Sequence, residues 1–176
     1  MFSSIRPTQA EIDAPVPGDT IVPDADVVMD RAFTLPQRPE RVWPWFMQLG
    51  KNRAGWYLPR WLETFIPRKS RALREIEPAL QNLEVGTIID DWGGRDATFE
   101  VALLEPLYTL VYKSKRGHVH ISWAITFRSE GDGDTRVQLR LRLTPVKRKL
   151  LAETFGGPVD VLTVAGLAAG LRERLT

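Results

Sequence analysis

Cysteine is absent from this chain of 176 residues. Disulfide frameworks, thiolate nucleophiles and Cys-ligated zinc or iron–sulfur sites are therefore excluded. The longest uncharged apolar run, residues 161–171, is much shorter than the roughly 20 residues that cross a bilayer. The first residues also lack the basic segment and apolar stretch of a secretory signal. The sequence thus predicts a cytoplasmic protein without a transmembrane segment, and peripheral membrane contact stays open.

A large excess of one charge is also missing, because 24 lysines and arginines face 22 acidic residues and the net charge is only +2. No whole-protein field therefore favours nucleic acid. The glycine-rich dinucleotide and phosphate-binding motifs and the Gly-x-Ser-x-Gly motif of hydrolases are absent. We expect neither nucleic acid nor a cofactor among the partners of this protein.

The hydrophobic fraction is 43%, which is ordinary for a chain that buries a single core. Four prolines fall within the first 24 residues, and no apolar periodicity accompanies them. The sequence predicts a flexible N-terminal arm over residues 1–24 and one domain over residues 25–176.

The start of that domain combines a strand with two short helical elements. Residues 27–34 are rich in β-branched and apolar side chains and predict a first strand. A helix is expected from about Pro39, with Val42, Trp45 and Phe46 on its buried face. Pro44 lies inside this helix and predicts that it is short or kinked. A second short helix is expected over residues 60–65.

Alternating apolar and polar residues then dominate the chain and predict an antiparallel meander. In its clearest part Ile121, Trp123 and Ile125 share one face, which predicts a buried face and a solvated face. A last helix over residues 159–175 is expected to cover the buried face. Five strands are expected at residues 85–90, 98–105, 107–113, 119–128 and 136–144.

Short motifs accompany this order of elements: Pro39-Glu40-Arg41-Val42-Trp43-Pro44-Trp45, Gln48-Leu49-Gly50, Arg53-Ala54-Gly55-Trp56-Tyr57, Val85-Gly86 and Trp123-Ala124-Ile125. Together they resemble the START-like (SRPBCC) superfamily, in its uncharacterised bacterial branch related to polyketide cyclase/dehydrase and lipid-transport proteins. The resemblance covers about residues 27–176. It departs at Thr87, where relatives commonly carry an acidic residue.

The resemblance implies an α+β, helix-grip fold. In that fold a seven-stranded antiparallel sheet curves around a long C-terminal helix, with two short helical elements after the first strand. It also implies an apolar cavity between the sheet and the helix. Ligand-binding residues are expected to be Arg53, Trp56, Tyr57, Asp91, Phe99, Tyr112, Trp123, Leu139, Gly166 and Gly170.

Several of these residues have a plain structural interpretation beside the functional one. Gly166 and Gly170 keep space for a ligand, or they let the C-terminal helix pack closely. Arg53 contacts a ligand, or it holds its own loop by hydrogen bonds. Asp91 stands on the cavity rim, or it forms a turn. His118 and His120 point to one side of a strand, but no third ligand is near in sequence and we expect no metal.

The function expected from these observations is binding or carriage of a small apolar or amphipathic ligand, lipid-like or polyketide-like. The alternative is a cofactor-independent cyclase or dehydratase that moves protons in the same cavity, although no catalytic residue is assigned. A protein-interaction domain with a filled core is the third hypothesis. We expect a monomer or a weak homodimer.

Overall fold

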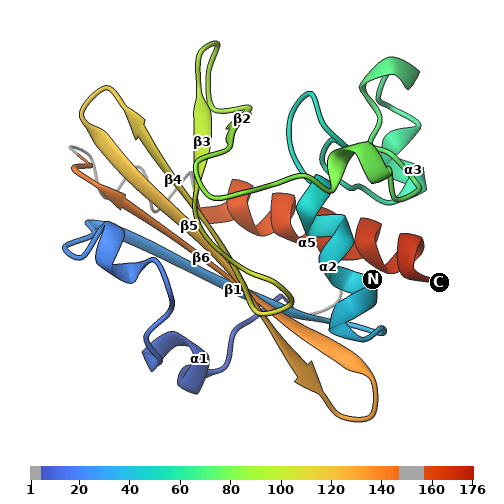
Figure 1. Cartoon of the computed structure of the whole chain (residues 1–176), viewed down its shortest axis with the longest axis horizontal. Helices are drawn as coiled ribbons and strands as arrows, with labels where there is room; N and C mark the ends of the chain where they lie inside the picture. Colours follow the sequence, from blue (N-terminus) through green and yellow to red (C-terminus); the bar gives the residue numbers. More distant parts are fainter. Residues whose placement is uncertain (1–4, 147–156) are drawn as a thin grey trace.

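The computed structural model describes residues 5–146 and 157–176. The fold is α+β and resembles a helix grip: one antiparallel sheet packs against a long C-terminal helix (Figure 1). The strands are β1 (Val27–Leu35), β2 (Ile88–Asp90), β3 (Thr98–Glu105), β4 (Thr109–Arg116), β5 (Val119–Glu130) and β6 (Asp134–Thr144). The helices are α1 (Gln9–Asp13), α2 (Pro39–Gln48), α3 (Arg60–Glu63) and α5 (Gly157–Leu175), with 3₁₀ turns η1 (Asp19–Ile21), η2 (Arg68–Ser70) and η3 (Pro78–Leu80).

The sheet has six strands in the order β1-β6-β5-β4-β3-β2, and every neighbouring pair is antiparallel. The prediction of seven strands is therefore wrong for the described part of the chain. The residues alone predicted six strands, and the seventh came only from the resemblance. Between α2 and β2 the chain is broken by prolines and 3₁₀ turns, and it contributes only isolated bridges at Gly50–Gly55 and Lys51–Asp90.

The inner face of the sheet carries the main core. Alternate side chains of the long strands, such as Ile125 and Leu139, pack there against Leu167 and Leu171 of α5. Helix α2 adds Phe46, whose ring meets Phe127 edge-on with centroids 4.9 Å apart. The predicted helices at both ends of the domain are thus confirmed as the layer that covers the sheet.

The outer face of the sheet is covered by residues 6–26, which lie across it opposite α5 (Figure 1). Val16 packs against Val111 and Ala124, and all three are buried. The prediction of a solvated outer face is therefore wrong, because α1, η1 and the residues around them cover that face. Lys147, Arg148 and Lys149, which follow β6 in the sequence, lie outside the described residues.

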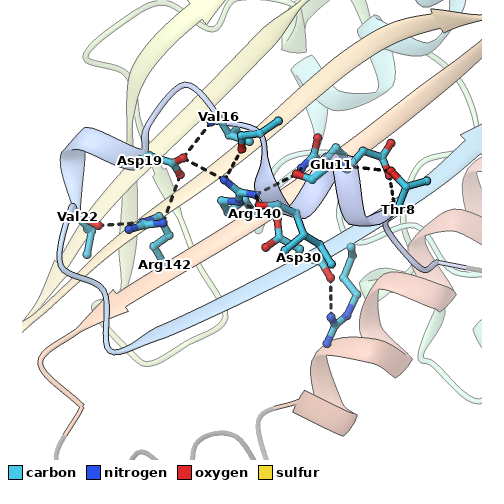
Figure 2. Close-up of polar contacts among 12 residues, drawn as sticks. Thr8, Glu11, Val16, Asp19, Val22, Asp30, Arg140 and Arg142 are labelled. Atoms are coloured by element: carbon cyan, nitrogen blue, oxygen red, sulfur yellow. Dashed lines mark hydrogen bonds and ion pairs between the residues drawn. The ribbon is translucent and has the colours of Figure 1, made fainter.

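Charged contacts fasten this segment to the sheet (Figure 2). Arg140 is only 4% exposed and donates to the carboxylates of Asp30 (2.7 Å) and Asp19 (3.0 Å). It also donates to the backbone carbonyls of Glu11 and Ile12. The arginine therefore satisfies carbonyls at the end of α1 as well as two acids.

Glu11 is the second buried charge on this face. Its carboxylate accepts two hydrogen bonds of 2.8 Å from Arg136 and closes a capping box with Thr8 at the start of α1. The hydrogen bond from Arg136 is the main reason that the pKa of Glu11 falls to about 2.

Among the described residues, no helix is both long and apolar enough to span a membrane.

Candidate ligand cavity

A cavity of about 410 Å³ lies between the inner face of the sheet and the first half of α5. Strands β3, β5 and β6 form its floor, and the chain before α3 and the turn after β2 complete its walls. Its lining residues are Trp56, Asp91, Trp92, Phe99, Arg116, Ile121, Trp123, Leu141, Leu143, Asp160, Thr163 and Val164.

Aromatic rings form a continuous wall of this cavity. The ring of Trp123 is stacked between those of Trp56 and Tyr112, at centroid distances of 6.1 and 5.7 Å. Phe99 lies 6.0 Å from Trp123, and Trp92 meets Trp56 edge-on at 5.9 Å. Inward alternation along β3 and β5 places Phe99 and Trp123 here, where their rings, tilted by 42° to each other, give the cavity an apolar aromatic lining.

Trp56 connects the two sides of the cavity. Its indole nitrogen donates to the backbone carbonyl of Thr163 on α5 at 3.2 Å. The loop that precedes Trp56 is closed by an isolated β-bridge between Gly50 and Gly55. Both glycines have a positive φ, which other residues rarely adopt. Trp92, which is 50% exposed, stands at the cavity mouth.

The cavity wall contains an ion pair whose two charges neutralise each other. Asp91 forms an ion pair with Arg116 and also accepts from the backbone N–H of Gly93 at 2.9 Å. The guanidinium of Arg116 lies over the ring of Phe99, 5.0 Å from its centroid. Asp91 is thus both a turn former and a lining residue, and its charge is balanced within the site.

Asp160, in the first turn of α5, is the other acid on the cavity wall. Burial raises the pKa of Asp160 above its ordinary value, and the nearby charge of Arg31 opposes this shift only in part. The Arg31 nitrogen lies 2.8 Å from the carboxylate, without the alignment of a hydrogen bond. Such a carboxyl group can hold or release a proton closer to neutral pH than an exposed aspartate can.

Four of the ten sequence-predicted ligand residues line the cavity: Trp56, Asp91, Phe99 and Trp123. Tyr57, Tyr112 and Leu139 lie in the core beside it. The Tyr57 hydroxyl donates to the carbonyl of Trp45 at 2.8 Å. Burial raises the pKa of both tyrosines well above the ordinary value, so both phenols keep their protons at neutral pH and neither is suited to release one.

Arg53 holds its own loop by hydrogen bonds, which is the structural one of the two roles considered for it. Its guanidinium donates to the backbone carbonyls of Met47 (3.1 Å) and Leu80 (2.6 Å), and it does not line the cavity. Gln48 has a similar role, because its side chain bonds to the backbone of Glu75 and Glu77. Both side chains hold the irregular chain that follows α2.

The two helix glycines permit close packing rather than space for a ligand. A Cβ atom on Gly170 would stand 2.6–2.7 Å from backbone atoms of Tyr57 and Leu58. One on Gly166 would stand 2.7 Å from the Cδ2 atom of Leu58. Tyr57 and Leu58, which follow Trp56, therefore pack directly against the backbone of α5 at Gly166 and Gly170.

Trp92, Arg116 and Asp160 line the cavity and were not among the predicted ligand residues. Trp92 gave a local signal, because Asp90, Asp91, Gly93 and Gly94 around it predict a turn at the surface, where a tryptophan is unusual in a purely structural role. Asp160 gave none, since an acid in the first turn of a helix is common. His118 and His120 are exposed on the outer side, away from this cavity.

No protein-family model matches the chain, and a search of curated proteins gives no match either. Solved structures do match it over most of their length. The protein Ms6760 from Mycobacterium smegmatis has 13% identity and a TM-score of 0.53, and the alignment covers 93% of this chain and 96% of that one. A Rhodobacter sphaeroides protein has 14% identity and a TM-score of 0.53, with 87% and 94% covered. CV1439 from Chromobacterium violaceum has 15% identity and a TM-score of 0.52, with 84% and 96% covered.

These likenesses show a shared fold. The chain has the helix-grip-like α+β fold of these bacterial proteins, and the START-like resemblance of the sequence is confirmed at the level of the fold. A fold of this kind hosts different activities, so function has to be argued from the cavity itself.

Proposed function

We propose that this protein binds a small apolar or amphipathic molecule, lipid-like or polyketide-like, in the cavity between its sheet and α5. The observation that carries the proposal is the aromatic wall around Trp123 beside about 410 Å³ of space. Ligand sites commonly have volumes of about 300–1,000 Å³, mostly apolar linings and a few placed polar groups. The cavity has each of these properties, and a filled core does not.

Burial of the ligand's hydrocarbon surface supplies most of the affinity. About 200 Å² of apolar surface, at roughly 25 cal/mol per Å², corresponds to about 5 kcal/mol before the entropic cost of binding. The Asp91–Arg116 pair adds an edge that can hydrogen-bond one polar group of an amphipathic ligand. A hydrocarbon with one polar end fits this division.

Native mass spectrometry of the purified protein, followed by organic extraction, tests the proposal directly. A stoichiometric apolar adduct is expected, together with competitive binding of an apolar fluorescent probe. Leu141→Trp fills the cavity from β6, and Thr163→Trp, at an exposed position on its rim, narrows the mouth. Each variant should weaken probe binding about tenfold or more, which corresponds to about 1.4 kcal/mol.

The matched control is Trp61→Ala, which removes an exposed tryptophan outside the cavity and should leave probe affinity unchanged. Loss of binding in this control, or unchanged binding in both filled variants, would mean that the probe binds elsewhere. If neither an adduct nor probe binding is found, the interaction-domain hypothesis replaces this one.

A second candidate function follows from Asp160. A carboxyl group with a raised pKa on an apolar wall suits proton transfer in a cofactor-independent cyclase or dehydratase. Asp160→Asn should then abolish conversion of the extracted ligand while binding is retained. A carrier instead returns the ligand chemically unchanged from wild type and variant alike after long incubation.

The remaining expectations stay proposals about the same protein. We infer that it acts in the cytoplasm, without nucleic acid, as a monomer or weak homodimer. The division into an arm over residues 1–24 and a ligand-binding domain over residues 25–176 also stays a proposal. Light scattering at increasing protein concentration tests the oligomeric state, and a stable dimer at low concentration would contradict it.

A further inference from the structure

Two large aromatic side chains are exposed on the short helix α3 and on the turn that follows it. Trp61 is 56% exposed and Phe65 is 82% exposed. Backbone hydrogen bonds from Thr64 to Arg60 and from Phe65 to Leu62 continue the helical winding through this turn. Residues four apart in such winding lie on one side, so the two rings form a single apolar patch.

Every exposed charged side chain within residues 60–71 is positive, and the exposed acid that contacts the start of this segment, Glu173, is ion-paired with Arg74 at 3.4 Å. Arg60, Arg68, Lys69 and Arg71 are all exposed. The one acidic residue of segment 60–71, Glu63, is buried and ion-paired with arginines 74 and 174 at 2.6 and 2.7 Å. Those two arginines lower the pKa of Glu63 against the opposing effect of burial, so its charge is already balanced inside the protein. Segment 60–71 thus shows aromatic rings and cations to solvent.

Residues 66–71 are tied back to the turn that carries Phe65, which keeps their basic side chains near the aromatic rings. The Arg71 side chain donates to the carbonyl of Ile66 at 2.9 Å, which ties it to the turn that ends at Phe65. The backbone N–H of Arg60 donates to the carboxylate of Glu173 at 2.9 Å and fixes the start of α3 against α5. In Figure 1, α3 and the segment after it project from the body of the protein beside the C-terminal part of α5.

We propose that residues 60–71 are a docking surface for a lipid bilayer that contains anionic lipids. Tryptophan and other aromatic rings favour the boundary between headgroups and acyl chains, where an apolar body and a polar edge are both satisfied. Basic side chains near an anionic leaflet are attracted to it, and the attraction falls off within a Debye length. The exposed aromatic and basic side chains of residues 60–71 complement an anionic bilayer surface in both charge and polarity.

The docking surface is close to the ligand cavity along the chain. Trp56 lines the cavity and Trp61 follows five residues later, so their Cα atoms are at most about 18 Å apart. Exchange of a lipid-like ligand between bilayer and cavity is the natural use of this arrangement. That use rests on the proposed function, whereas docking to the bilayer does not.

Vesicle flotation with the full chain tests the docking surface. Vesicles of phosphatidylcholine with about a quarter of phosphatidylglycerol carry the negative charge that the cations need, and pure phosphatidylcholine vesicles do not. The wild-type protein should float with the anionic vesicles, and less so as salt is added. Trp61→Ser/Phe65→Ser and Arg68→Glu/Lys69→Glu should each reduce the bound fraction about tenfold.

Matched controls keep the same chemistry at other places. Tyr108→Ser removes a ring that is 67% exposed in the β3–β4 turn, and Arg95→Glu/Lys115→Glu makes the same charge change elsewhere. Both controls should float like wild type. Since all the substituted side chains are exposed, the variants should keep the wild-type melting temperature.

The inference is overturned if the wild-type protein stays unbound, or if the Trp61→Ser/Phe65→Ser variant binds as well as wild type. Binding to an acidic polypeptide such as polyglutamate, but not to vesicles, would identify a protein partner instead and also overturn it. The apolar probe assay separates the two proposals. Trp61→Ser/Phe65→Ser should retain full probe binding, and Leu141→Trp should retain full vesicle binding.

Discussion

The two faces of the sheet are covered in opposite ways. On the outer face, an N-terminal segment is held by buried ion pairs and hydrogen bonds around Arg140 and Glu11. On the inner face, α2 and α5 pack by apolar contact, and part of the space stays open beside Trp123. Hydrogen bonds and ion pairs are directional, so the N-terminal segment has little freedom to rearrange. Apolar packing that leaves a cavity can instead admit a ligand.

This difference indicates a division of labour. Buried ion pairs do little for net stability compared with apolar packing, but they are costly to break and so hold a cover in one place. The outer cover also shields the backs of the strands whose inner side chains form the cavity floor. A rigid floor under an open cavity is what a binding site needs, because ordering it at binding would reduce affinity.

The largest expected effect comes from removing the central arginine of the outer face. Arg140→Ala leaves Asp30, whose side chain is 11% exposed, with an unpaired charge. Breaking such a buried pair costs about 3–5 kcal/mol. Urea unfolding should show this loss, while probe affinity in the cavity at native conditions should change little.

Arg128→Ala is the matched control on the same face. The Arg128 side chain is 66% exposed and lies 3.4 Å from Glu11, so its removal should cost less than about 1 kcal/mol. Equal losses in the two variants would contradict a buried network centred on Arg140. A large fall in probe affinity in Arg140→Ala would show that the two faces are not independent.

The second effect is a dependence of stability on pH that arises at Glu11. Its pKa is about 2 in the folded protein and 4.5 ordinarily, so the unfolded chain binds more protons between these values. The stabilisation is complete above pH 4.5 and is lost as pH falls toward 2. The shift corresponds to about 3 kcal/mol.

Unfolding free energies measured from pH 6 down to 2 check this expectation, with Glu11→Gln as the reference. The variant lacks the titrating group, so the difference between the two proteins should be constant above pH 4.5 and shrink below it. A difference that stays constant throughout would mean that the carboxylate of Glu11 has an ordinary pKa.

Strands and helices of the domain were predictable because each long element shows one period of apolar residues. Alternation over residues 119–128 and 136–144 matches β5 and β6, and the proline-free run after Pro158 matches α5. The covering of the outer face was not predicted. Its elements are short, and they depend on partners more than 90 residues away, such as Arg136 for Glu11.

One local signal for that segment was present. Thr8 and Glu11 stand three residues apart, which is the spacing of a capping box, and the structure confirms both hydrogen bonds. The cavity was only partly predictable. Alternation identified Phe99 and Trp123 as inward-facing, but no period shows which inward side chains are packed over and which face open space. Asp160 faces the cavity only because of how α5 lies on the sheet.

The third effect tests how tightly the inner cover is packed beside the cavity. Gly170→Ala places a methyl group 2.6–2.7 Å from backbone atoms of Tyr57 and Leu58, which cannot move away easily. A loss of about 2 kcal/mol in unfolding free energy is expected, since overpacking typically costs 1–3 kcal/mol.

Gly166→Ala is the matched comparison on the same helix. Its methyl group would meet only the end of the Leu58 side chain, which can rotate away, and alanine gains up to about 1 kcal/mol of helix propensity. Its net effect should be near zero. Equal destabilisation at both positions would show that the Leu58 side chain is as immobile as the backbone.

The smallest effect concerns the sign of pH dependence on the inner face. Burial raises the pKa of Asp160 above 3.8, so the folded protein holds this proton more tightly than the unfolded chain does. Ionisation of Asp160 therefore lowers stability as pH rises from about 3.8 to the raised pKa of the folded protein, which is opposite to the effect of Glu11. Asp160→Asn removes the titration, so its unfolding free energy relative to wild type should increase between pH 3 and 7. A relative stability that instead falls over this range would mean that Arg31 outweighs burial, and that both faces of the sheet hold their acids as paired carboxylates.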